Sequence, residues 1–266
     1  MRVLTLNVNG IRSAARRGLF EWLPTQRVDV VCLQEIRAHE AQLADEIFHP
    51  RGLHCSYLHA TRGGYSGVAV LSRRRPDAVV RGLARTAGNV PAWREFDTEA
   101  RYLEVRFGGL SIVSTYLPSG SSGEARQQAK FRFLELFMPY LKRLHRRPRD
   151  YILCGDWNIA HKQIDLENWR GNQKHSGFLP AERAWMDELL GPARYVDAFR
   201  AIDQRPRQYT WWSNRGRAWD KNVGWRIDYQ IVTPGLAGHV ERASIYKDQR
   251  FSDHSPLIID YALPTP

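Results

Sequence analysis

The 266-residue chain is 43% hydrophobic and 11% aromatic, a composition typical of a folded globular protein and not of a disordered one. No apolar run approaches the ~20 residues needed to cross a bilayer, and the first residues lack the apolar stretch of a signal peptide. The 39 Lys and Arg against 28 Asp and Glu give a net charge of +11, which favours a polyanionic partner. Nine tryptophans strengthen this expectation, because aromatic surfaces beside cations suit nucleic acid.

The three cysteines point to a reducing compartment. None of them forms a Cys-x-x-Cys pair, so the sequence argues against a zinc knuckle. Cys32 and Cys154 lie in apolar runs and are expected to be small buried core residues. We therefore expect a cytoplasmic protein that is monomeric and does not associate with membranes.

Several short apolar or alternating segments read as β-strands, with turn residues between them. Between two of them, Gly108-Gly109 predicts a tight hairpin, because glycine supplies the positive φ angles that a two-residue turn requires. The predicted strands cover residues 28–33, 67–71, 101–107, 110–117, 151–154, 227–232 and 257–261.

Helices are expected between these strands. Ser121 to Glu124 resembles a capping box that opens an amphipathic helix, which Pro139 should kink or end early. A second helix should begin at Pro180 and stop at Gly191. Strands dominate, so the pattern predicts one α/β domain over residues 1–266, built of mixed layers with much antiparallel pairing.

Polar residues that could carry chemistry follow two of the predicted strands. Glu35 stands at the exit of the first strand, where a carboxylate could bind a hard cation, although alone it also fits a solvated loop. Asp156 and Asn158 follow the strand at 151–154, and Gly155 before them allows close approach of backbone or ligand. If the chain stays extended, the two side chains face the same way. An ordinary Asp/Asn turn explains this segment equally well.

Two further segments bring a histidine and two carboxylates. Asp253-His254 could pair an acid with an imidazole, but adjacent side chains usually point apart, so Asp253 could serve a metal instead. Asp228 interrupts an apolar strand and needs a partner if it is buried, and His254 is a candidate for that partner. An exposed strand face is the competing explanation for Asp228.

Taken together and in order, the motifs resemble the exonuclease III family of DNA repair nucleases, within the endonuclease/exonuclease/phosphatase fold shared with DNase I. Each piece is short, but the set runs from end to end of the chain. The matching segments are 6–12, 33–35, 116–118, 155–161, 164–166, 171–172, 176–178, 209–212, 222–229 and 252–256.

The resemblance implies a four-layer sandwich of α+β type, with two mostly antiparallel sheets face to face and helices outside. It implies Mg²⁺, for which Mn²⁺ can substitute, as the cofactor and double-stranded DNA as the substrate. It also assigns roles to three sets of residues. The catalytic set is Asp156, His254, Tyr116, Asn158 and Asp228. The metal set is Glu35, Asn7, Asp253, Asp156 and Asn158. The DNA-binding set is Asn172, His175, Trp211, Trp225 and Arg215.

Within these sets, Asp156 resembles the residue that positions or deprotonates the water, and Asn158 and Tyr116 resemble phosphate contacts. His254 resembles the histidine on the scissile phosphate, with Asp228 as its orienting carboxylate. The resemblance does not decide whether Asp156 or His254 handles the proton.

Two departures from the family pattern bear on the substrate. His175 stands where relatives often carry a smaller residue or an amide, and an imidazole there could crowd a pocket for a baseless sugar. The loop at 119–124 contains no arginine that could wedge into the duplex. We therefore expect a 3′→5′ exonuclease, 3′-phosphatase or 3′-phosphodiesterase with weak incision at abasic sites. His175 could also be one more phosphate contact, which would leave abasic-site incision as the main activity.

Two other functions compete with DNA cleavage. A lipid or inositol phosphatase could share the fold, but its substrate would not require tryptophans beside a basic surface. A non-catalytic DNA-binding module could also keep the fold, but the complete set from Asn7 to His254 argues against it. Clustered arginines, such as those at 73–75, 143–149 and 205–217, could be phosphate contacts or solvated faces.

Overall fold

The computed structural model describes residues 1–84, 86–87 and 90–265. Its strands form two six-stranded sheets and one two-stranded ribbon. The first sheet has the order β13-β14-β1-β2-β4-β3. Its strands are β1 (Arg2–Asn7), β2 (Val30–Gln34), β3 (His54–Leu58), β4 (Val68–Ser72), β13 (Val240–Ile245) and β14 (Leu257–Tyr261).

The second sheet has the order β5-β6-β7-β8-β12-β9. Its strands are β5 (Ala78–Arg81), β6 (Tyr102–Phe107), β7 (Leu110–Tyr116), β8 (Asp150–Asp156), β9 (Val196–Asp197) and β12 (Asp228–Val232). β10 (Trp211–Trp212) and β11 (Gly224–Trp225) form the separate ribbon. In each six-stranded sheet one neighbouring pair is parallel, β1 with β2 and β7 with β8, and the other pairs are antiparallel.

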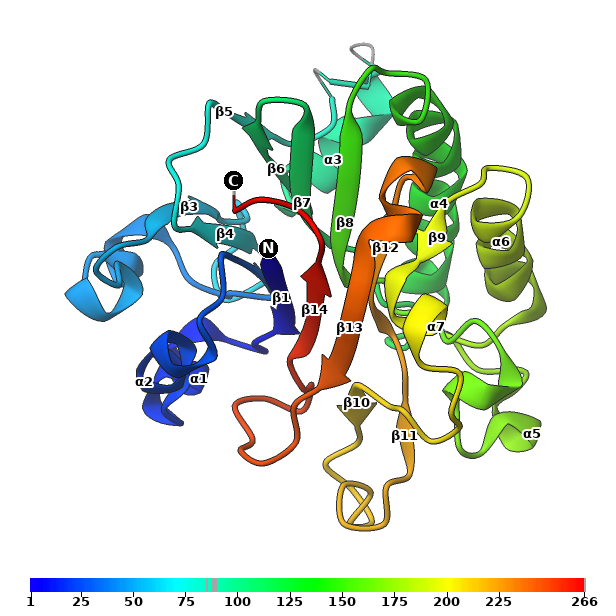
Figure 1. Ribbon diagram of the computed structural model, residues 1–266. Helices are drawn as coiled ribbons and strands as arrows, with labels where there is room; N and C mark the ends of the chain where they lie inside the picture. Colours follow the sequence, from blue (N-terminus) through cyan, green and yellow to red (C-terminus); the bar gives the residue numbers. More distant parts are fainter. Residues whose placement is uncertain (85, 88–89, 266) are drawn as a thin grey trace.

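Helices alternate with strands along the chain and lie mainly on the outer sides of the sheets (Figure 1). The α-helices are α1 (Ile11–Arg16), α2 (Leu19–Trp22), α3 (Arg94–Asp97), α4 (Glu124–Leu144), α5 (Trp169–Asn172), α6 (Pro180–Leu190) and α7 (Ala198–Ile202). Short 3-10 helices cover Leu23–Gln26, Glu40–Leu43, Glu46–Phe48, Pro91–Trp93, Gln163–Asp165 and Pro234–His239. Among the described residues, no helix has the length and apolar character that a membrane crossing requires.

Three buried clusters show why the sheets stack as layers. One cluster lies between the two sheets and contains Val30 and Cys32 of β2 with Ile152 and Cys154 of β8. Their neighbours along the strands point the other way, and Leu33 packs under α1 and α2. Successive side chains of a strand face opposite sides, so two buried faces require apolar residues at nearly every position.

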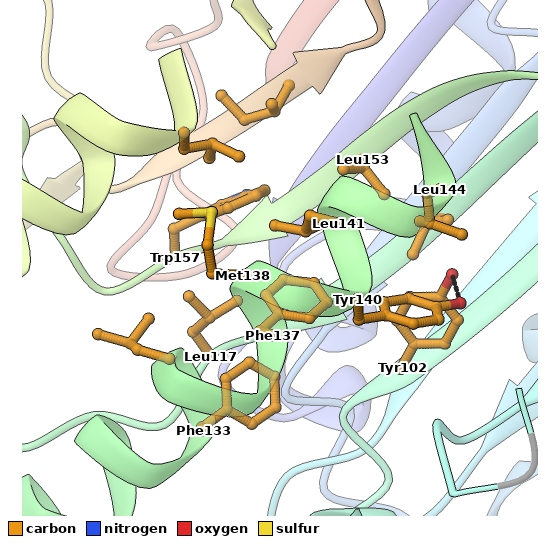
Figure 2. Packing of buried hydrophobic residues seen from close by; sticks show 14 of the residues in the cluster. Tyr102, Leu117, Phe133, Phe137, Met138, Tyr140, Leu141, Leu144, Leu153 and Trp157 are labelled. Atoms are coloured by element: carbon orange, nitrogen blue, oxygen red, sulfur yellow. Dashed lines mark hydrogen bonds between the residues drawn. The ribbon is translucent and has the colours of Figure 1, made fainter. Parts of the chain in front are cut away.

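The outer face of the second sheet is covered by α4 and α6. Figure 2 shows α4 residues, including Phe133, Phe137 and Leu141, packed toward Leu153 of β8 and Trp157 just after it. The order helix, sheet, sheet, helix is the four-layer sandwich that the resemblance implied, and that prediction is confirmed.

The predicted strands are all present, with slightly shifted bounds, and the hairpin turns at Gly108, whose φ is 52°. One helix prediction was wrong, and of the two effects expected of Pro139, a kink or an early end, the early end does not occur. α4 begins after Gly123 and has no side-chain cap, so the expected capping box is absent. Pro139 lies inside α4 and does not end it, because the carbonyl of Glu135, which loses its amide partner, lies on the exposed face of the helix.

Candidate active site

The predicted polar residues meet at one end of the stacked sheets because of strand register. β1 and β2 run parallel with Asn7 beside Gln34, so Asn7 and Glu35 leave the sheet at the same edge. In the second sheet Asp156 pairs with Tyr116 on one side and with Asp228 on the other. The loop before β14 then brings Asp253 and His254 to the same edge, where His254 forms an isolated bridge with Trp211.

These side chains line a cleft of about 840 Å³. Of the predicted site residues, nine contribute to its wall: Glu35, Tyr116, Asp156, Asn158, His175, Trp211, Trp225, Asp253 and His254. Asn7 and Asp228 lie beneath it and are fully buried. Asn172 and Arg215 stand apart from the cleft. The side chain of Asn172 bonds to the Asn168 carbonyl in α5, and Arg215 is exposed in the loop between β10 and β11.

His254 is held between two carboxylates. Its Nδ1 lies 2.8 Å from Asp228 Oδ2, and its Nε2 lies 3.9 Å from Asp156 Oδ2. Burial alone lowers the pKa of His254, but the carboxylates of Asp228, Asp156 and Asp253 outweigh it and raise the pKa to about 10. The structure therefore stabilises a protonated imidazolium whose Nε2 side faces the cleft.

Asp156 occupies the centre of the cluster. Burial, with a further contribution from the nearby charge of Asp228, raises its pKa to about 7, although His254 and the amides of Asn7 and Asn158 act in the opposite direction. The amide nitrogen of Asn7 donates to Asp156 Oδ2 and to Glu35 Oε2, each at 2.9 Å. Asn7 therefore orients both carboxylates, while its own oxygen accepts the backbone N–H of Asn9.

Asn158 reaches the cleft by a turn. The strand ends at Asp156, and Asn158 has a left-handed φ of 53°, so the expectation of an extended chain was wrong. Its backbone N–H donates to Asp156 Oδ1 at 2.8 Å, and its side-chain nitrogen donates to the Leu117 carbonyl at 2.9 Å. This Asx-type turn sets the amide beside Asp156.

The oxygen-rich wall of the cleft fits a hard divalent cation. Glu35 follows β2 with a φ of 57°, and its Oε1 pairs with Arg37. Asp253 accepts bonds from Asn9 at 2.9 Å and from the Trp211 indole at 3.1 Å. Carboxylate oxygens are preferred ligands of Mg²⁺ and Ca²⁺, whereas zinc sites favour Cys and His.

A second group, formed by Asp156, Asp228 and His254, also has potential ligand atoms within 4.8 Å of one another. The Nδ1 atom of His254 is already used by Asp228, which favours an acid–base role for this group.

Trp211 and Trp225 form an aromatic corner of the cleft. Their rings meet edge to face at 6.3 Å and 80°, because β10 and β11 pair these two residues directly. His175 lies in the same wall, on the loop that runs from Lys174 to Leu179. The glycine- and serine-rich segment 119–124 lines the wall as well, so both departures from the family pattern face the cleft.

Sequence reasoning missed several residues of the site. Arg101 is buried beneath Tyr116, with its guanidinium carbon 4.8 Å from the ring centre, and it also bonds to Tyr65. Asn9 and Arg37 hold the carboxylates of Asp253 and Glu35. Arg37 lies two residues after Glu35 and Asn9 two after Asn7, so proximity could have suggested both. No local pattern distinguishes Arg101.

Comparison with known proteins identifies the family. Residues 4–254 match the model of the Endonuclease/Exonuclease/phosphatase family. The chain belongs to this family. It is 34% identical over 259 residues to an exodeoxyribonuclease of Bacillus subtilis, covering 97% of this chain and 98% of that protein. It is 33% identical over 266 residues to the DNA repair nuclease APEX1 of Danio rerio, covering 99% and 83%.

A solved structure agrees with these matches. An AP endonuclease from Archaeoglobus fulgidus superposes with a TM-score of 0.86 at 27% identity, over 99% of this chain and all of that chain. The family and fold implied by the sequence motifs are thereby confirmed.

Proposed function

We propose that this protein is a Mg²⁺-dependent phosphodiesterase that acts on double-stranded DNA. The observation that carries the proposal is the cluster of Asp156, His254 and Asp228 at the wall of a cleft that also holds Glu35 and Asp253. The relatives support it, since they are named as an exodeoxyribonuclease and a DNA repair nuclease. The net charge of +11 suits a polyanionic substrate.

Glu35, Asp253 and Asn7 would hold Mg²⁺ or, in its place, Mn²⁺, with Asp156 and Asn158 at the margin of the same site. The cation would neutralise charge on the scissile phosphate. Side chains of the cleft bind the phosphate and accept the proton of the water. His254, kept protonated by Asp228, places a positive hydrogen-bond donor toward the phosphate. Asp156 then accepts the proton of the attacking water, because an imidazolium has no free nitrogen to act as a base.

Tyr116 and Asn158 complete the phosphate contacts, and Trp211 and Trp225 receive the terminal sugar. Asn172 and Arg215, which lie outside the cleft, would contact the flanking duplex. We further propose that the whole chain is one catalytic domain and that it acts as a cytoplasmic monomer, consistent with the unpaired thiols of Cys32 and Cys154 in the interior.

His175 and the segment 119–124 support a preference for 3′ ends. Both line the cleft, where the bulk of the His175 imidazole would restrict the room for a baseless sugar, and the serines and glycines of 119–123 offer no side chain to wedge into a base stack. The expected activities are 3′→5′ exonuclease, 3′-phosphatase and 3′-phosphodiesterase, with weak abasic-site incision.

A substrate panel with Mg²⁺ tests the proposal. The substrates are duplexes with an abasic site, a 3′-phosphate at a nick, a recessed 3′ end and an unmodified nick, each offered to the parent and to His175→Gly. We expect the parent to favour the 3′-phosphate and the variant to gain abasic-site incision. Strong abasic incision by the parent that the variant leaves unchanged would refute the preference.

Abasic-site incision as the main activity is the second candidate. The similarity to a structure named as an AP endonuclease favours it. The same panel separates the two, because only this candidate predicts that the abasic duplex is the best substrate of the parent. Release of phosphate from inositol phosphates with no activity on DNA, or DNA binding without any cleavage when Mg²⁺ is present, would refute both.

A further inference from the structure

A buried ion pair that the proposed chemistry does not use lies behind the cleft. Lys130 of α4 and Glu182 of α6 are both fully buried, and Lys130 Nζ lies 2.6 Å from Glu182 Oε1. Burial lowers the pKa of Lys130, which reflects the cost of removing its charge from water. Well-packed apolar residues can often replace such a pair without loss of stability. Because apolar residues could hold the two helices together equally well, we ask what else the contacts of this ion pair do.

Lys130 is bound to the phosphate side of the cleft. Its Nζ donates to the backbone carbonyl of Asn158 at 2.7 Å. Asn158 has the left-handed backbone of the turn after β8, and its amide lies beside Asp156. The lysine thus fixes this turn from behind, on the side away from the substrate.

Glu182 is bound to the loop at 174–179, which lies beside the Asn158 turn. Its Oε2 accepts the backbone N–H of Gly177 at 2.7 Å and that of Leu179 at 2.9 Å. These residues belong to the loop that carries His175. The carbonyl oxygen of Gly177 also accepts the backbone N–H of Ala160, just beyond Asn158.

The turn at Asn158 and the loop at 174–179 are therefore joined twice, directly by the Ala160–Gly177 backbone bond and, behind it, through the buried ion pair. A chain of contacts runs from the Asn158 carbonyl to Lys130, to Glu182 and to the amides of Gly177 and Leu179. We propose that Lys130 and Glu182 are positioning residues that lock the Asn158 turn to the loop at 174–179. The lock keeps the phosphate contact and the wall at His175 at a fixed separation, and so contributes to substrate selection. The part of this inference that concerns His175 rests on the proposed function.

The test uses a double variant, Lys130→Met with Glu182→Gln. It removes both charges, and the glutamine oxygen still accepts the amides of Gly177 and Leu179. The connection to Asn158 is lost, together with the bonds that Glu182 Oε1 accepts from the side chains of Gln127 and Ser176. A matched control is Lys142→Met with Glu188→Gln, which removes an ion pair of 2.5 Å between the same two helices at a half-exposed position. Thermal unfolding and steady-state kinetics are measured for both on the 3′-phosphate and abasic duplexes.

For the double variant we expect kcat on the 3′-phosphate duplex to fall by ~10- to 100-fold with little change in KM, because a displaced contact mainly weakens the transition state. The ratio of abasic incision to 3′-phosphate removal should rise. In an Asn158→Ala background the same double substitution should cost no further kcat, since the side chain that it positions is gone. The control should keep the parent's kinetics.

Unchanged kcat and selectivity in the double variant would overturn the inference, as would a loss that is fully additive with Asn158→Ala. If the double variant does not fold, Glu182→Gln alone is used. Its amide group faces the Lys130 ammonium and should displace it from the Asn158 carbonyl, so parent-like kinetics would again refute the lock. The parent's own preference between the two duplexes tests the proposed function, whereas the changes on substitution test the lock, so each can fail separately.

Discussion

Replacing Asp228 with Asn should shift the working pH range of the enzyme toward acid. Asp228 is fully buried, and it is the partner bonded to His254 Nδ1, at 2.8 Å. Asparagine has nearly the same shape and can still accept that bond through its oxygen. The substitution therefore removes a charge while keeping the geometry, which separates the electrostatic role of Asp228 from its orienting role.

The size of the shift follows from the imidazole. The pKa of His254 is about 10 in the intact cluster, so the protonated form that contacts phosphate is present below that pH and is lost above it. Without the Asp228 charge, the opposing effect of burial remains and the pKa should fall toward its ordinary value of about 6.5. At pH 8 only about 3% of the imidazole would then be protonated, a loss of roughly 30-fold in rate.

The acidic limb of the pH profile should also move toward lower pH. The charge of Asp228 contributes to the raised pKa of Asp156, about 7, and Asp156 must be deprotonated to accept a proton. Removing that charge lets Asp156 ionise at lower pH. The profile of kcat/KM against pH, measured on a 3′-phosphate duplex, should thus show both limbs displaced toward acid.

The comparison of pH 6 with pH 8 is decisive. Near pH 6 the variant should keep most of the parent activity, and near pH 8 it should lose most of it. A loss of the same size at every pH would contradict the electrostatic role and would mean that Asp228 acts only by orienting the ring.

Three other predictions test separate parts of the site. Glu35→Gln should raise the Mg²⁺ concentration for half-maximal activity at least ~10-fold and weaken Mn²⁺ binding measured calorimetrically, because a carboxylate ligand becomes a neutral amide. Trp225→Ala should raise KM for duplexes with a 3′ end by ~10-fold, through the loss of roughly 1–3 kcal/mol of aromatic contact, while the unfolding temperature stays near that of the parent. Burial would raise the pKa of Asp165, but Arg226 and Arg200 outweigh it and lower the pKa to about 2. Asp165 should therefore contribute on the order of 2 kcal/mol to the free energy of unfolding above its ordinary pKa, and this contribution should be lost as the pH falls from ~5 to ~1. Urea unfolding should accordingly show a gap between the parent and Asp165→Asn that narrows in acid.

The sequence predicted most of the central strands because their signals are local. β2 and β8 are each buried on both faces, so their sequences are unbroken apolar runs. The hairpin at 102–116 is marked by its glycine turn. Most of the strands it missed lack such signals. β3, β5 and β13 have one buried position at most, and β9, β10 and β11 have two residues each. β1 was also missed, although all its residues after Arg2 are buried. Their pairing depends on neighbours that are distant in the chain.

Asn7, Glu35, Tyr116, Asp156 and Asp228 came together for the same reason, since each lies at or next to a strand end that the topology brings to one edge. The residues behind them gave no such signal. Arg101, Lys130 and Glu182 lie in a strand flank and two helices, and each resembles an ordinary charged surface residue until the fold buries it. Arg101 is tied to Tyr116, 15 residues away, and Lys130 to Asn158, 28 residues away, so no spacing rule could connect these two to the site. Glu182 bonds locally to Gly177 and Leu179, but its link to Lys130 spans two helices.

Gly155 shows how closely the chemistry depends on strand packing. A Cβ atom at this position would lie 1.8 Å from the Thr115 carbonyl oxygen, far inside any tolerated contact. The missing side chain lets β7 and β8 approach in the register that sets Tyr116 beside Asp156. The sequence suggested that this glycine admits backbone or ligand, and the structure shows that it admits backbone. Its contribution to the site is therefore indirect: the glycine touches no substrate, yet it fixes the spacing between the phosphate-contacting Tyr116 and the proton-accepting Asp156 that we propose.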